Sequence, residues 1–177
     1  MGEKGQASSV FNLLIAAVIA IAILVVLMQV LQIIPDFSGG DPTEQAASKV
    51  RDGVNLLGTP QIIENVNFKP NTVVSAGTIA SKSNALSEGQ VCVLISGSAP
   101  NETAFRDPTD DGKIIRYDGA LNQKVRLVVH CDNSGKVEET LNDSGYADDF
   151  EISLDTCSTL DSGRSTKYCV VAVISDI

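Results

Sequence analysis

A long apolar run near the start of the chain constrains what the protein can fold into more than any other feature. The run extends from Val10 to Ile34, and residues 13–28 contain no polar side chain. An α-helix over the whole run would be roughly 37 Å long, which exceeds the thickness of a bilayer core. Pro35 and Gly39-Gly40 end the run. The sequence therefore predicts a long apolar N-terminal helix, suited to lipid or to the interior of a helix bundle.

Several kinds of segment share this composition. A secretory signal peptide has a shorter apolar core, with a small-residue cleavage site after it. Here the run is longer, and the sequence IIPDFSGG that follows is a weak site of that kind. An uncleaved membrane anchor or a buried helix of a soluble protein needs no particular residues before the run. The residues that precede the run therefore discriminate between the alternatives.

Those residues, EKGQASSVFNLL, resemble the class III signal peptide of archaeal type IV pilin-like proteins. In that family a short leader ends in Lys-Gly, and the mature chain begins at Gln. Here Lys4-Gly5 precede the expected cleavage site, Gln6 would be the first mature residue, Ser8 the third and Leu14 the ninth. The fifth position is Val10, where the family often has Glu, so one element of the pattern is missing.

The resemblance covers residues 4–34 and implies a division of the chain into four parts. Residues 1–5 form a leader peptide, and residues 6–35 a transmembrane helix that later packs in a filament core. Residues 36–60 form a hinge and a short amphipathic helix, and residues 61–177 an extracellular β domain. The implied partners are copies of the chain in a helical filament, a prepilin peptidase, and the membrane before assembly. The implied location is a filament on the cell surface.

Residues 36–60 carry the signals of a short helix. Asp41 is a good N-cap residue, and Pro42 fits the first helical position. Apolar residues then recur at helical spacing until Gly58, although Gly53 interrupts the pattern with poor helix propensity. The apolar residues are Ala46, Ala47, Val50, Val54 and Leu57. We expect this helix to lie against the outer domain.

From residue 61 onward, short β-rich runs alternate with turn residues. KVRLVVHC, residues 124–131, places alternate apolar side chains on one face, whereas YCVVAVIS, residues 168–175, is apolar on both faces, as in a central strand. The expected strands are Ile62–Phe68, Thr72–Ala80, Gln90–Ser96, Lys113–Tyr117, Lys124–Cys131, Phe150–Asp155 and Tyr168–Ser175. This pattern predicts a mainly antiparallel, β-sandwich-like domain, and the fold class is α+β.

Charge and composition favour some functions over others. The net charge is −9, and no basic patch is present, so the chain is a poor candidate for binding nucleic acid. His130 is the only histidine, and it is expected to face solvent on a strand. No glycine-rich phosphate loop is found. We therefore expect the protein not to be an enzyme.

The chain contains four cysteines, Cys92, Cys131, Cys157 and Cys169. An even number in a domain held outside a membrane predicts two disulfides, and free buried thiols are the alternative. We expect Cys157 to pair with Cys169 and Cys92 with Cys131, although four cysteines allow three connectivities.

One acidic stretch, DPTDDGKIIRYD, nearly fits a calcium-binding loop. Its candidate ligands are Asp107, Thr109, Asp111 and Asp118, although Pro108 is unusual inside such a loop. An acidic surface turn is the alternative. No cofactor is expected apart from this candidate calcium ion.

Two triplets, beginning at Asn101 and at Asn142, match the N-glycosylation acceptor pattern. The function expected from all these features is that of a structural subunit of an extracellular type IV pilus-like filament, with its β domain on the outer surface for adhesion or attachment. The alternative is a binding module tethered outside the membrane by an uncleaved N-terminal anchor.

Overall fold

The computed structural model describes residues 14–21, 23, 40–100, 104–157 and 166–174. The chain divides into two compact units, Met1–Ser38 and Gly39–Ile177. The expected cleavage site at Gly5 and Gln6 lies outside the described residues.

The first unit contains a short helix at residues 14–21. No helix in the described part of the chain is both long enough and apolar enough to cross a bilayer. The expected long apolar N-terminal helix is therefore wrong. Helices in proteins gain most of their stability from packing, and β-branched residues lower helix propensity. The side chains of Leu14, Val18 and Ile21 are 59%, 58% and 62% exposed, so they lack such packing.

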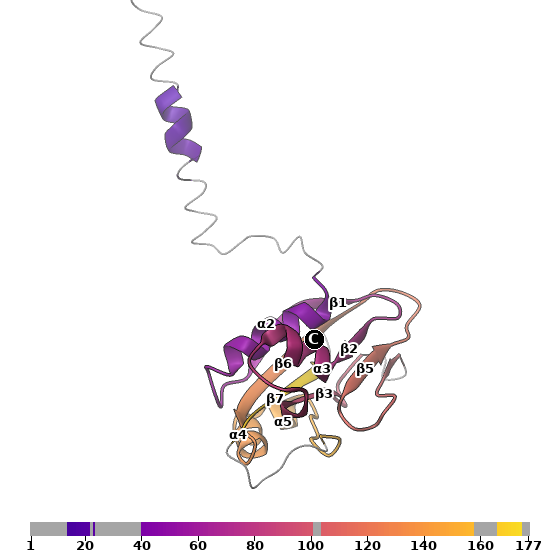
Figure 1. Cartoon of the computed structure of the whole chain (residues 1–177). Helices are drawn as coiled ribbons and strands as arrows, with labels where there is room; N and C mark the ends of the chain where they lie inside the picture. The colour runs from indigo at the N-terminus through magenta and orange to yellow at the C-terminus, as the bar shows by residue number, and fades with distance from the viewer. Residues whose placement is uncertain (1–13, 22, 24–39, 101–103, 158–165, 175–177) are drawn as a thin grey trace, which may run out of the picture. The chain divides into compact units, whose positions relative to one another are not determined.

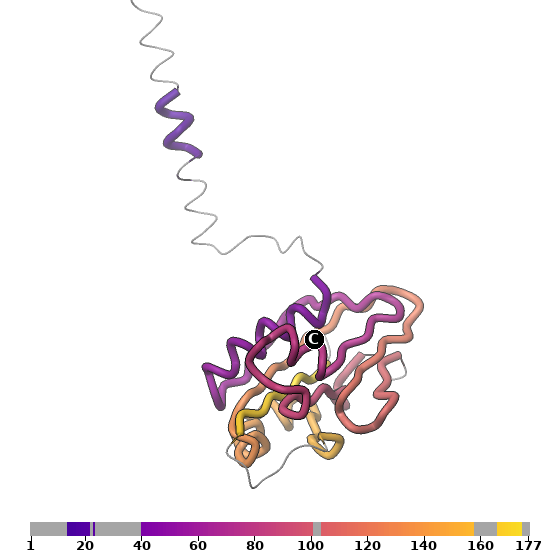
Figure 2. The backbone as a smooth tube through the Cα atoms, in the orientation of Figure 1, coloured from indigo at the N-terminus to yellow at the C-terminus, as the bar shows by residue number. Residues whose placement is uncertain are grey.

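The second unit is built on a four-stranded mixed sheet (Figure 1). Its strand order is β1 (Gln61–Phe68), β6 (Gln123–Asn133), β7 (Lys167–Ile174) and β3 (Val91–Ile95). β6 pairs antiparallel with β1 and with β7, whereas β3 pairs parallel with β7. The prediction that the last strand is central is confirmed, and Figure 2 traces it in yellow through the folded unit.

A smaller antiparallel sheet adjoins the main one. Its order is β2 (Val73–Ser75), β5 (Ile114–Tyr117) and β4 (Phe105–Arg106). Three buried rings connect the two sheets, because Phe68 of β1 stacks edge-on against Phe105 with 5.2 Å between centroids, and Phe105 lies 4.8 Å from Tyr117.

Helices, and not a second large sheet, cover the main sheet. α2 (Pro42–Gly53) and α3 (Ala76–Ser83) share one apolar core with one face, and η1 (Glu88–Gln90) follows α3. α4 (Val137–Asp143) and α5 (Tyr146–Asp149) share a second core with the other face. The expected β-sandwich is therefore wrong, although the fold is α+β.

One expected strand is shorter than predicted, and another is absent from the structure. Within 72–80, only Val73–Ser75 is strand, because Ser75 accepts a hydrogen bond from the Thr78 amide and starts α3 there. Residues 150–155 form turns and loop, and not a strand. Both segments contain β-prone residues whose tertiary context overrides their propensity.

The expected helix after the hinge is confirmed as α2. The Asp41 carboxylate caps it by accepting a hydrogen bond from the Thr43 amide at 2.9 Å. Arg51, near its C-terminus, donates to the carbonyls of Lys82 and Ser83, which satisfies the last carbonyls of α3. The two helices therefore pack as one layer over the sheet.

Candidate functional site

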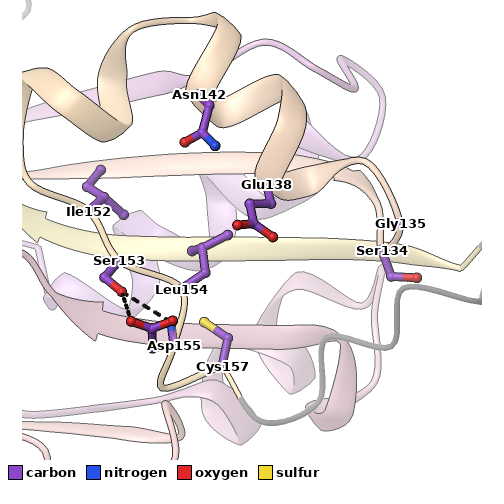
Figure 3. Close-up of a pocket in the computed structure, with 9 residues that line it drawn as sticks. All are labelled: Ser134, Gly135, Glu138, Asn142, Ile152, Ser153, Leu154, Asp155 and Cys157. Carbon is purple, nitrogen blue, oxygen red and sulfur yellow. Dashed lines mark hydrogen bonds between the residues drawn. The ribbon is translucent and has the colours of Figure 1, made fainter.

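A groove of about 490 Å³ lies between α4 and the loop that follows α5 (Figure 3). This volume is within the range of small-ligand sites. Its lining residues are Ser134, Gly135, Glu138, Asn142, Ile152, Ser153, Leu154, Asp155 and Cys157. In Figure 3, Glu138 and Asn142 extend from α4 toward the loop that carries Ser153, Leu154 and Asp155.

Apolar packing fixes one wall of the groove, and a backbone hydrogen bond and a disulfide fix the other. α4 packs its buried Val137 and Leu141 on the sheet, which turns Glu138 and Asn142 outward on one helical face. On the opposite wall, the Cys157 amide donates to the Leu154 carbonyl at 2.9 Å. The disulfide between Cys92 and Cys157 attaches that wall to β3.

The groove is polar and acidic. Glu138 and Asp155 contribute carboxylates, and none of the described residues that line it is a lysine, arginine or histidine. The Ser153 hydroxyl donates to Asp155 Oδ2 at 2.7 Å. Such a lining can accept hydrogen bonds from hydroxyl or ammonium groups. Sequence reasoning missed this groove because residues 150–155 were expected to be a strand. The alternation of Val137 and Leu141 with acidic residues was the available signal for α4.

His130 lies apart from the groove, and its predicted exposure is wrong. The side chain is 0% exposed in the core between β6 and α4, where Nε2 lies 2.9 Å from the Thr140 hydroxyl. Burial lowers the pKa of the imidazole below its ordinary value of 6.5, and the nearby Asp132 carboxylate opposes the shift without cancelling it. The sequence missed this because β6 is covered on both faces, so its polar positions are also buried.

The candidate calcium ligands are engaged within the protein. Asp107 accepts hydrogen bonds from the amides of Thr109, Asp110 and Gly112, at 3.0, 2.9 and 3.0 Å. This carboxylate caps a tight turn, and its oxygens are occupied by donors.

The other two carboxylates pair with basic side chains. Asp111 lies 2.6 Å from Lys113 Nζ, and this ion pair, with the Thr109 hydroxyl, lowers the pKa of the Asp111 carboxyl. Asp118 pairs with Arg116 at 2.6 Å. No group of three or more metal-binding side chains is found in the described ranges. The arrangement therefore does not support a calcium site.

The four cysteines form two disulfides, but the expected pairing is wrong. Cys92 bonds to Cys157 and Cys131 to Cys169. Cys131 and Cys169 stand opposite each other on the neighbouring strands β6 and β7. Because β7 separates β3 from β6, Cys92 cannot reach Cys131. The two disulfides are those of an extracellular or secreted protein.

The two candidate glycosylation sites differ in what the structure describes. Asn142 is exposed on α4 and lines the groove. Asn101 lies outside the described residues. In comparisons with known proteins, no family model, curated protein or solved structure matches the chain.

Proposed function

We propose that the chain is a structural subunit of an extracellular type IV pilus-like filament. The apolar segment 10–34 packs against its copies in the filament core, and the disulfide-bonded unit faces outward for adhesion or attachment. The observation that carries the proposal is the position of Lys4-Gly5-Gln6, immediately before the apolar run. Cleavage after Gly5 removes only the leader and keeps the apolar segment, whereas a simple anchor needs no such sequence.

The exposure of the apolar side chains supports assembly through this segment. Val18 and Ile21 are 58% and 62% exposed in the isolated chain. Contiguous exposed apolar side chains mark a surface that contacts lipid or another protein. Before assembly the membrane supplies that contact, and afterward copies of the same segment do, since both offer an apolar environment. Prepilin peptidase acts between Gly5 and Gln6 on the membrane-held precursor, before assembly.

Replacing Val18 with Asp tests assembly through the apolar segment. An unpaired charge in an apolar core costs several kcal/mol, so this variant should form no filaments visible by electron microscopy. Leu121→Asp is the matched control, because Leu121 is 79% exposed on the folded unit. Filaments of Val18→Asp as abundant as those of the control would overturn the proposal.

N-terminal sequencing of filaments tests the cleavage step separately. The assembled chain should begin at Gln6, and replacing Gly5 with a bulky residue should leave the uncleaved precursor in the membrane. An assembled chain that begins at Met1 would contradict cleavage but not assembly.

A tethered binding module is the second candidate function, and the polar groove between α4 and the 152–157 loop favours it. That protein would remain a membrane-held monomer, with no filaments from the wild-type chain. Electron microscopy of the producing cells therefore separates the two functions.

A further inference from the structure

The His130 side chain makes polar contacts between the main sheet and α4. The Thr140 hydroxyl lies 2.9 Å from His130 Nε2 and donates its proton to the Lys136 carbonyl at 2.9 Å. The hydroxyl oxygen therefore accepts from Nε2–H, which assigns the neutral tautomer from the hydrogen-bond network. Nδ1 is buried and makes no hydrogen bond with the described residues.

The surroundings of the ring favour its neutral form. Val137 and Leu141 of α4 and Val170 of β7 are apolar neighbours in the same core. The ionisable groups on this face of the sheet include Asp132, two residues along β6, and Tyr168, which stands opposite Asp132 on β7. Arg126, four residues back along β6, is on the same face, where it lies over the Phe150 ring and 3.9 Å from Glu64. The charged residues of α4 and its N-cap are exposed and turned away from the sheet. These are Lys136, Glu138, Glu139 and Asp143.

We propose that His130 is an acid-sensitive lock that holds α4 on the sheet. A proton from solvent adds to Nδ1, which has no hydrogen-bond partner among the described residues, and creates a buried imidazolium. The Asp132 carboxylate and the Val137 backbone favour this charged form, but the cost of burial outweighs them. An unpaired buried charge is costly, so the state in which α4 separates and water reaches the ring gains population as the pH falls.

The structure limits how far this opening extends. α4 has seven residues and no side-chain N-cap, so it is not stable without packing. Beyond α5, the disulfide to Cys92 holds Cys157 on β3, and before α4 the strand β6 is central in the sheet. The opening is therefore confined to the segment between β6 and Cys157. This segment carries both walls of the groove, so acid changes the groove as well.

Hydrogen exchange of the full chain in detergent micelles, at pH 7.5 and pH 5.0, tests the lock. After correction for intrinsic exchange rates, amides of α4 and α5 should lose protection severalfold at pH 5.0, while those of β7 keep theirs. His130→Gln keeps an amide donor for Thr140 but cannot titrate, so its α4 protection should not depend on pH.

A second variant keeps the test decisive if His130→Gln does not fold. Asp132→Asn removes the carboxylate that favours the imidazolium, yet keeps an oxygen to accept from the Asn133 amide. It should lower the pKa of His130 in the closed state further, so the loss of α4 protection should become deeper and continue to lower pH than in the wild type. Equal α4 protection at both pH values in the wild type, or an unchanged transition in Asp132→Asn, would overturn the proposal.

Discussion

Gly53, the last residue of α2, lies so close to Cys131 that a Cβ at position 53 would stand 2.7 Å from the Cys131 sulfur. Real Cβ atoms do not approach heavy atoms so closely, so a larger residue would displace the helix or the disulfide. The same disulfide joins β6 to β7 beneath α2. A glycine that weakens the helix pattern in the sequence is therefore required by the packing of α2 on the sheet.

Gly53→Ala should destabilise the protein by about 1–3 kcal/mol, because overpacking outweighs the gain in helix propensity. At an unconstrained helical position the same change would stabilise by about 0.5–1 kcal/mol. Urea unfolding measures the difference. Gly89→Ala is the control, since a Cβ there would meet nothing within 4 Å. In a Cys131→Ala/Cys169→Ala background the Gly53→Ala penalty should shrink, and an unchanged penalty would show that the disulfide is not the obstacle.

Removing either disulfide should cost about 4 kcal/mol in the loop-entropy model, with the Cys92–Cys157 bond costing slightly more. The reason is that the Cys92–Cys157 bond joins residues 65 positions apart, whereas Cys131–Cys169 joins residues 38 positions apart. Paired Cys→Ala variants and thermal unfolding measure the costs. Peptide mapping without reduction checks the connectivity, and a Cys157–Cys169 peptide would contradict the structure.

Asp107→Ala should destabilise the protein by about 1–3 kcal/mol, because three backbone amides lose their acceptor. Asp107→Asn retains one carboxyl oxygen and should lose less. Asp110→Asn is the control, since Asp110 contributes its amide to the turn and asparagine tolerates the same positive φ of 53°. The melting temperature of the wild type should be the same with calcium and with chelator. A higher melting temperature with calcium would support a calcium site at this turn.

The sequence predicted the elements whose signals are local. The alternation in β6 placed Val125, Leu127, Val129 and Cys131 on one face, and all four are buried in the core beneath α2. The N-cap at Asp41 and the apolar stripe of α2 could also be predicted from the sequence, because capping and helical spacing act within a few residues.

The features that the sequence predicted wrongly, or did not reveal, depend on contacts between distant segments. The disulfide pairing follows from the strand order, in which β7 separates Cys92 from Cys131, and no local pattern encodes that order. The burial of His130 follows from α4 covering the second face of the sheet. The groove needs α4 and the 152–157 loop together, and the loop is held in place by a cysteine 65 residues away.

Two groups should make stability depend on pH in separate windows. Burial lowers the pKa of His130 in the folded protein. Below the pKa of about 6.5 that the histidine has in the unfolded chain, the unfolded chain therefore binds more protons than the folded protein. The free energy of unfolding falls as the pH drops from about 6.5 to the folded pKa. The pKa of Asp111 is lowered mainly by Lys113, so its small contribution is present above 3.8 and lost as the pH falls further. Urea unfolding between pH 7.5 and 5.0 should show the first loss in the wild type but not in His130→Gln. Asp111→Asn should lose as much stability as the wild type between pH 7.5 and 5.0, because the pH dependence that Asp111 causes lies below this range.

A chain that lacks residues 1–38 should fold as a monomer with both disulfides and should form no filaments. Both apolar cores and all four cysteines belong to the unit Gly39–Ile177, so the contacts that stabilise it do not require the first unit. The α2 cap is also complete, because Asp41 and Thr43 lie within the retained unit. Thermal unfolding should give a melting temperature close to that of the full chain in detergent, and sedimentation should give a monomer. Filaments built from the shortened chain would show that assembly uses the folded unit and not the apolar segment. A shortened chain that fails to fold would show instead that residues 1–38 stabilise the second unit.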